Sequence, residues 1–197
     1  MGGHHLLLGE LKDIVTGRLI PDTHDERYRQ KIARILMNQS SFKKDEISTR
    51  RELIVGTDPK KAVVFLDFVI HLENRMVMIV KYGPGSIVTR HQPALAAARL
   101  VAPYRVPIVV VSNGREADVL DGETGRVTGR GFRAIPHRET VMENISEFSF
   151  RPVTPSQAAM ASRLIYAYEV DGSCPCDDGI CRLPAQNTED HHDGKQQ

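Results

Sequence analysis

Two charged side chains interrupt apolar segments of this 197-residue sequence. Asp67 lies inside the run VVFLDFVIHL, and Lys81 follows the run MVMIV. Burial of a lone carboxylate or ammonium is costly unless the group is paired, hydrogen-bonded or bound to a metal ion. The carboxylate of Asp67 is therefore expected to have a partner of one of these kinds. The alternatives are a structural ion pair with Lys81, or two strand-end charges that reach solvent.

Two neighbouring strands are expected to position these charges. Residues 63–72 and 76–82 are rich in β-branched and aromatic side chains and are joined by a tight connection, which predicts a β-hairpin. Side chains alternate between the two faces of a strand, so Ile79 and Lys81 share one face of the second strand. If that face coincides with the face that carries Asp67, the carboxylate and the ammonium lie near each other.

The other elements surround this hairpin. Thr23 to Glu26 has the form of a capping box, which predicts a helix that fades near residues 38–41. A short strand is expected at 52–55, a helix at 93–101 and a buried strand at 107–111. A small hairpin, a short helix and a longer helix after Thr154-Pro155 follow. This order predicts an α/β domain around a mixed sheet flanked by helices.

The predicted organisation is one domain at 1–150, a C-terminal helix at 151–172, and a polar tail at 173–197 that is expected to be disordered.

The net charge of the whole sequence is +1, so the total does not have the strongly basic character typical of nucleic-acid-binding proteins. Residues 1–150, however, hold 22 Lys and Arg against 18 Asp and Glu, whereas the remainder holds 4 against 7. If the arginines of the larger part converge on one face, phosphate binding becomes plausible.

No apolar stretch approaches the length of about 20 residues that a membrane span needs, and the first residues lack the apolar core of a signal peptide. We therefore expect a cytoplasmic protein with no membrane partner. No phosphate-binding loop of the type G-x-x-x-x-G-K-[ST] is present, so no ATP is expected.

The three cysteines form a cluster, Cys174, Cys176 and Cys181, with the spacing C-x-C-x4-C. Three thiols within eight residues are a candidate site for zinc or an iron–sulfur cluster. A fourth ligand for zinc would have to come from a nearby histidine or acid. The alternative is that these cysteines are reduced, redox-active thiols in a loose tail.

From about Glu26 to Pro136 the chain resembles the N-terminal nuclease domain of the restriction subunit of type I restriction enzymes, which belongs to the PD-(D/E)xK nuclease superfamily. The resemblance rests on the helix with Glu26, the strand with Asp67, the strand ending IVKYGPGS, the helix with Gln92, and the run VPIVVVSNGREADVLDGETG. It implies a restriction-endonuclease-like mixed sheet.

The resemblance implies Mg²⁺-dependent hydrolysis of DNA phosphodiesters, with Asp67 and Glu26 as ligands of Mg²⁺ and Lys81 assisting the attacking water. Gln92 matches a glutamine that helps to orient the site in some relatives. Glu26 has a second interpretation, because it can simply cap its helix. The sequence departs from the family pattern at Ile79, where the motif has its second acid, and hard cations need oxygen ligands.

Two functions therefore stay open, together with a metal- or redox-dependent accessory role for the cysteine tail. The first is a nucleic-acid-binding protein with a degenerate endonuclease site, in which Lys81 and Arg90 contact phosphate beside Gly83-Pro84-Gly85. The second is an active Mg²⁺-dependent DNA endonuclease. Ile79 favours the first. DNA and an unknown protein are the partners considered.

Overall fold

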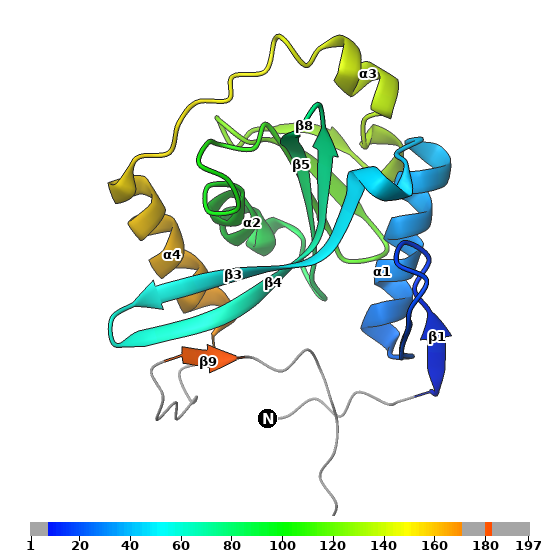
Figure 1. Ribbon diagram of the computed structural model, residues 1–197, viewed down its shortest axis with the longest axis horizontal. Helices are drawn as coiled ribbons and strands as arrows, with labels where there is room; N and C mark the ends of the chain where they lie inside the picture. The colour runs from blue at the N-terminus through cyan, green and yellow to red at the C-terminus, as the bar shows by residue number, and fades with distance from the viewer. Residues whose placement is uncertain (1–7, 171–179, 183–197) are drawn as a thin grey trace, which may run out of the picture.

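The computed structural model describes residues 8–170 and 180–182, the latter as backbone only. Its centre is a mixed β-sheet with the strand order β3-β4-β5-β6-β7-β8, and β9 pairs with β4 beside this path. Helices α2 and α4 pack on one face of the sheet and α1 packs on the other (Figure 1). The predicted α/β class, with a mixed sheet flanked by helices, is confirmed.

A short antiparallel hairpin of β1 (Glu10–Lys12) and β2 (Leu19–Pro21) precedes the first helix. Helix α1 (His24–Arg34) begins at the predicted cap, since the Thr23 hydroxyl accepts a hydrogen bond from the helix backbone. The helix continues into a π-helical turn at Ile35–Gln39, which matches the predicted fading of the helical pattern.

Strands β3 (Ile47–Thr57), β4 (Lys60–Leu72) and β5 (Arg75–Tyr82) form an antiparallel meander. The predicted β4–β5 hairpin is confirmed, and both residues of its turn, Glu73 and Asn74, have the positive φ that a tight two-residue turn requires. Strand β3 is longer than the predicted segment, because pairing with β4 at every position except Arg50 stabilises residues whose own pattern is polar.

A parallel pair stands at the centre of the sheet. Helix α2 (His91–Ala98) connects β5 to β6 (Ile108–Ser112), which therefore runs parallel to β5. Strands β7 (Ala117–Asp121) and β8 (Val127–Arg130) return antiparallel, as the predicted small hairpin requires. The carboxyl ends of β5 and β6 lie at one edge, next to the beginning of α1.

The last described elements are α3 (Arg138–Glu143), α4 (Pro155–Glu169) and β9 (Ile180–Arg182). Thr154 and Gln157 cap α4 reciprocally, with proline at the first helical position, as predicted. The remaining helices are single 3-10 turns at Lys44–Glu46, Val88–Arg90 and Phe132–Ala134. Among the described residues, no helix has the length and apolar character needed to cross a bilayer.

Alternating side chains of the sheet supply two cores. On one face, Ile79, Val109 and Val111 pack against the alanines of α2 and against Ile165 of α4. On the other face, sheet residues such as Val110 pack against apolar residues of α1 and its π-turn. The central strands are thus covered on both faces, which explains their nearly continuous apolar sequence.

Helix α4 is fixed to β3 at a glycine. Ser162 Oγ accepts a hydrogen bond from Gly56 N at 2.8 Å and donates one to Gly56 O at 3.0 Å. Gly56 has a φ of +107°, and a Cβ at this position would collide with the carbonyl of Lys60 and lie 2.9 Å from the ring of Tyr166. The close approach of α4 to β3 therefore depends on glycine at this position.

We expect Gly56→Ala to lower the free energy of unfolding by about 2 kcal/mol or more, because it combines an unfavourable φ with a backbone collision. Gly85→Ala is the matched control, since Gly85 has a φ of +88° but nothing within 4 Å of an added Cβ. Urea unfolding checks both variants. Equal losses in the two variants would contradict the role of the collision.

Candidate functional site

Side chains replace main-chain pairing at the point where β4 and β5 part. The hydrogen-bonded register of the two strands ends at Phe68 opposite Val80. Beyond this pair the backbone N–H of Tyr82 donates to Asp67 Oδ2 at 2.7 Å, and Lys81 Nζ donates to the carbonyl of Phe65 at 3.1 Å. We call this segment, residues 65–67 of β4 with residues 81–82 of β5, the β4–β5 fork.

Asp67 is buried in the fork and faces an arginine of α1. Its other oxygen, Oδ1, accepts a hydrogen bond from Arg29 Nε at 2.6 Å. Burial disfavours the charged form of Arg29, but the Asp67 carboxylate and its hydrogen bond outweigh this, with help from Glu26, so the pKa of Arg29 is raised. Arg29 is therefore a permanent cation beside Asp67.

Glu26 is the second predicted acid, and its side chain turns inward from α1. Its carboxylate lies 2.5 Å from Arg50 Nη2, 3.6 Å from Arg29 Nη1 and 3.1 Å from Gln30 Nε2. The Thr23 hydroxyl caps the helix through the backbone N–H of Glu26, so the carboxylate itself is used elsewhere. Arg29 thereby links the two acids that the sequence singled out.

Lys81 forms an ion pair with an acid that is distant in sequence, on helix α4. Its ammonium lies 2.7 Å from Glu169 Oε2 at the last residue of α4, and these two side chains are only 11% and 14% exposed. The partners of Asp67 are Arg29 and the Tyr82 backbone instead. Asp67 and Lys81 thus occupy the same fork but pair with different elements.

The other predicted site residues, Gln92 and Arg90, are not buried. Gln92 is exposed at the beginning of α2, and no hydrogen bond in the described part of the chain joins it to the fork. Arg90 lies against the loop that follows β5, with its guanidinium close to Gly83 and Nη2 donating to the carbonyl of Pro84 at 3.3 Å.

Several of the arginines that follow Lys81 in the sequence are paired with acids. Arg105 and Arg151 both contact Glu123, and Arg138 forms a charge-assisted pair with Glu46 at 2.7 Å. These arginines do not converge on the fork. The charge of these arginines is therefore balanced locally by acids.

Comparison with known protein families gives one decisive match. Residues 24–136, more than half of the chain, match the type I restriction enzyme R protein N terminus. The chain belongs to this family. The matched residues include Glu26, Asp67 and Lys81, whereas Glu169 lies outside them. No match was found among curated proteins or among solved structures.

Ile79, at the position of the second acid in the implied nuclease motif, is fully buried in the core on the α2 side of the sheet. Its neighbours there include Val69 and Val109. The described residues of this core cluster are apolar, so they would offer an acid at this position no hydrogen-bond partner from their side chains. The structure therefore explains why an apolar residue is stable at this position.

The family resemblance implies Mg²⁺, and the described residues do not fit this ion as they are arranged. Both oxygens of Asp67 accept hydrogen bonds, and the carboxylate of Glu26 faces two guanidinium groups. A divalent cation would have to lie beside the permanent charge of Arg29. Within the residues that the structure describes, no group of three or more His, Cys, Asp and Glu side chains could hold a metal ion.

Sequence reasoning missed the partners of the predicted residues. Arg29 lies three positions after Glu26, so helical spacing could have identified it. Arg50 lies within a strand but has a φ of +53°, and Glu169 is far away in sequence, so no local pattern points to either. Tyr82 contributes a backbone N–H, which sequence does not reveal.

The cysteine prediction falls largely outside the described residues. Cys174 and Cys176 are not among them, and of Cys181 the structure gives only its place in the backbone of β9. Binding of zinc or an iron–sulfur cluster by these residues stays a prediction.

We expect Glu169→Ala to lower the free energy of unfolding by about 3 kcal/mol, because it leaves the Lys81 ammonium buried without its counter-charge. Replacing both partners, as in Lys81→Met with Glu169→Leu, should restore most of this loss. The exposed Glu147 provides a control, since Glu147→Ala should change stability by less than about 0.5 kcal/mol. Urea unfolding checks these variants. An equally small loss of unfolding free energy in Glu169→Ala and Glu147→Ala would exclude a structural role for the Lys81–Glu169 ion pair.

Ile79→Glu should destabilise the protein by several kcal/mol at neutral pH, because it places a carboxylate in an apolar core. Burial raises the pKa of such a carboxyl, so the loss should shrink as the pH falls toward 5. Ile79→Val, with an expected cost of about 1 kcal/mol, controls for packing. Urea unfolding at the two pH values checks this, and an equal loss at both would contradict burial of the introduced carboxyl.

Proposed function

We propose that this protein binds nucleic acid through a PD-(D/E)xK-like domain whose endonuclease site is degenerate. The proposal depends on one observation: both carboxylate oxygens of Asp67 already accept hydrogen bonds. Oδ1 accepts from Arg29 and Oδ2 accepts from the backbone N–H of Tyr82. Metal-dependent hydrolysis needs carboxylate oxygens open to the ion. In this chain the first carboxylate of the motif is committed to the fold instead.

The environment of the fork supports the same conclusion. Position 79 carries a core isoleucine in place of the second acid, and Lys81 is bound to Glu169 and to the Phe65 carbonyl. A lysine in these contacts cannot reach an attacking water without first breaking a buried ion pair. The cost of breaking such a pair, about 3 kcal/mol, works against catalysis.

Two features support nucleic acid as the ligand. The family consists of N-terminal parts of restriction enzyme subunits, which suggests DNA as a partner. The loop after β5 presents Gly83-Pro84-Gly85, with nothing within 4 Å of an added Cβ at Gly85 and the Arg90 guanidinium beside Gly83. Arginine and open backbone of this kind contact phosphate in many nucleic-acid complexes.

The alternative is an active Mg²⁺-dependent endonuclease that uses Asp67 and Lys81. It requires Asp67 to exchange Arg29 for a cation and Lys81 to leave Glu169 when DNA binds. Cleavage assays separate this alternative from the proposal directly.

We expect the protein to bind labelled single-stranded and duplex DNA with an affinity that falls steeply between about 50 and 200 mM salt. Arg90→Gln should weaken binding to both forms about three- to tenfold and reduce the salt dependence by about one phosphate contact. Arg126 is exposed and lies in the connection between β7 and β8, so Arg126→Gln is the control variant. Fluorescence anisotropy measures all three proteins.

The same samples should leave plasmid and single-stranded DNA intact in Mg²⁺ and in Mn²⁺. Cleavage by the parent protein that disappears in Asp67→Asn would overturn the degenerate site and establish the alternative. Absence of binding to either form of DNA would overturn the nucleic-acid function itself.

A further inference from the structure

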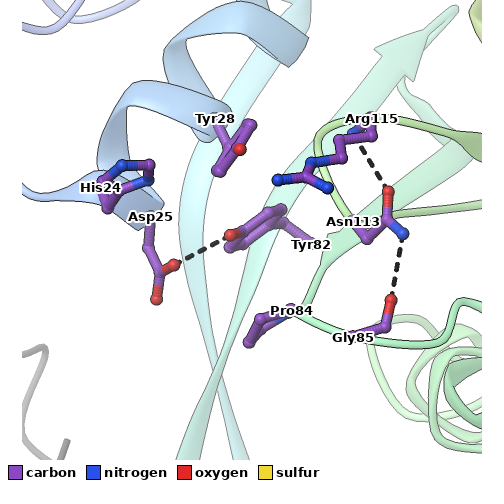
Figure 2. A pocket seen from close by; sticks show the side chains of 8 residues that line it. All are labelled: His24, Asp25, Tyr28, Tyr82, Pro84, Gly85, Asn113 and Arg115. Carbon is purple, nitrogen blue, oxygen red and sulfur yellow. Dashed lines mark hydrogen bonds between the residues drawn. The ribbon is translucent and has the colours of Figure 1, made fainter.

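A pocket of about 350 Å³ lies at the carboxyl ends of the parallel strands β5 and β6. Its lining comes from the loops that follow these two strands and from the first turns of α1 (Figure 2). Ligands commonly bind in α/β proteins at this position, where loops diverge beyond the strand ends. The pocket is adjacent to the fork, because Tyr82 belongs to both.

Hydrogen bonds between the lining elements hold the pocket in shape. Asn113 Nδ2 donates to Gly85 O at 3.0 Å, which ties the two loops together. Lys31 Nζ donates to Gly114 O at 2.8 Å and so ties α1 to the loop after β6. The Tyr28 ring packs directly on Gly114, where any Cβ would collide with it. The site therefore needs little rearrangement to accept a ligand.

Aromatic rings form one wall of the pocket. Tyr28 and Tyr82 stack with ring centroids 5.9 Å apart, and His24 lies 5.7 Å from Tyr28. Tyr82 is buried, and its hydroxyl donates to Asp25 Oδ1 at 2.8 Å; burial and this hydrogen bond raise the pKa of Tyr82, so the phenol stays neutral. Tyr28 is only half-buried, so part of its ring is open to a planar ligand.

A cation stands beside these rings. Arg115 is exposed, and its side chain extends from its loop toward the two tyrosines (Figure 2). Its backbone N–H is fixed by Asn113 Oδ1 at 3.0 Å, and no acid among the described residues forms an ion pair with its guanidinium. Asp25, the acid in the lining, approaches Tyr82 from the other side in this view.

An aromatic surface next to an arginine suits a ligand with a flat ring and a negative group. A nucleotide has both, since its base stacks on aromatic rings and its phosphate pairs with guanidinium. The volume lies at the lower end of the range for small-molecule sites, which matches one nucleotide better than a base pair. An unpaired nucleotide, as at a strand end or in a single strand, therefore suits the pocket best.

We infer that this pocket, formed by His24, Tyr28, Tyr82, Pro84 and Arg115, binds one unpaired nucleotide of a nucleic-acid strand. This inference rests on the proposed nucleic-acid function and deepens it, because it specifies single-stranded or frayed ends as the preferred substrate. In this arrangement Arg90 contacts the phosphate backbone of the neighbouring nucleotides, whereas the pocket distinguishes unpaired from paired nucleotides.

The test compares blunt duplex with duplex that carries a single-stranded overhang, by anisotropy with the full chain. The parent protein should bind the overhang form at least fivefold more tightly. Tyr28→Leu and Arg115→Gln should abolish this preference and leave binding to blunt duplex within twofold, whereas Arg126→Gln should retain it. Equal binding of the two forms, or a preference that persists in both variants, overturns the inference.

A second measurement distinguishes failure of this inference from failure of the proposed function. Adenosine 5′-monophosphate should perturb the NMR signals of both Tyr28 and Arg115 in the parent protein, whereas inorganic phosphate at the same concentration should perturb Arg115 more weakly and leave Tyr28 unchanged. This result supports the pocket even if no DNA binds, in which case only the proposed DNA function fails. Equal perturbation by phosphate alone, or none by either compound, overturns the nucleotide site. Circular dichroism of each variant verifies that it folds.

Discussion

The backbone N–H of Tyr82 needs an acceptor at the point where β5 parts from β4, and Asp67 provides it. This single hydrogen bond fixes one carboxylate oxygen, and the other oxygen then binds Arg29 of α1. The sheet and the first helix are thereby joined through one side chain. The same contact holds Tyr82 in place, with its ring against Tyr28 and its hydroxyl on Asp25.

Charges at the fork are balanced on both sides of the sheet. On the α1 side, Glu26 and Asp67 face Arg29 and Arg50, and on the α4 side Lys81 faces Glu169. Buried charges are stable only when partners replace the lost water, so each of these groups constrains its neighbours. A site with this degree of internal compensation has little electrostatic need for an added ion.

The sequence was sufficient to predict the fold class and most elements, because patterns such as the β4–β5 hairpin and the Thr154 cap depend on local chemistry. It also predicted that Asp67 and Lys81 need partners, since charged side chains within apolar strands are easily recognised, and both are buried. It did not reveal their partners. Glu169 meets Lys81 only through the packing of α4, and the extent of β3 depends on its pairing with β4. Long-range contacts of this kind leave no periodic signal in the chain.

Helix α4 has a consequence for how the molecule folds as a unit. It lies outside the matched residues 24–136, yet it contributes Ala161 and Ile165 to the core on its face of the sheet. A fragment cut at the boundaries of the family match would expose this apolar surface and leave Lys81 without its acid. Such a fragment would be prone to aggregation. The unit with a complete hydrophobic core is therefore larger than the unit that sequence similarity defines.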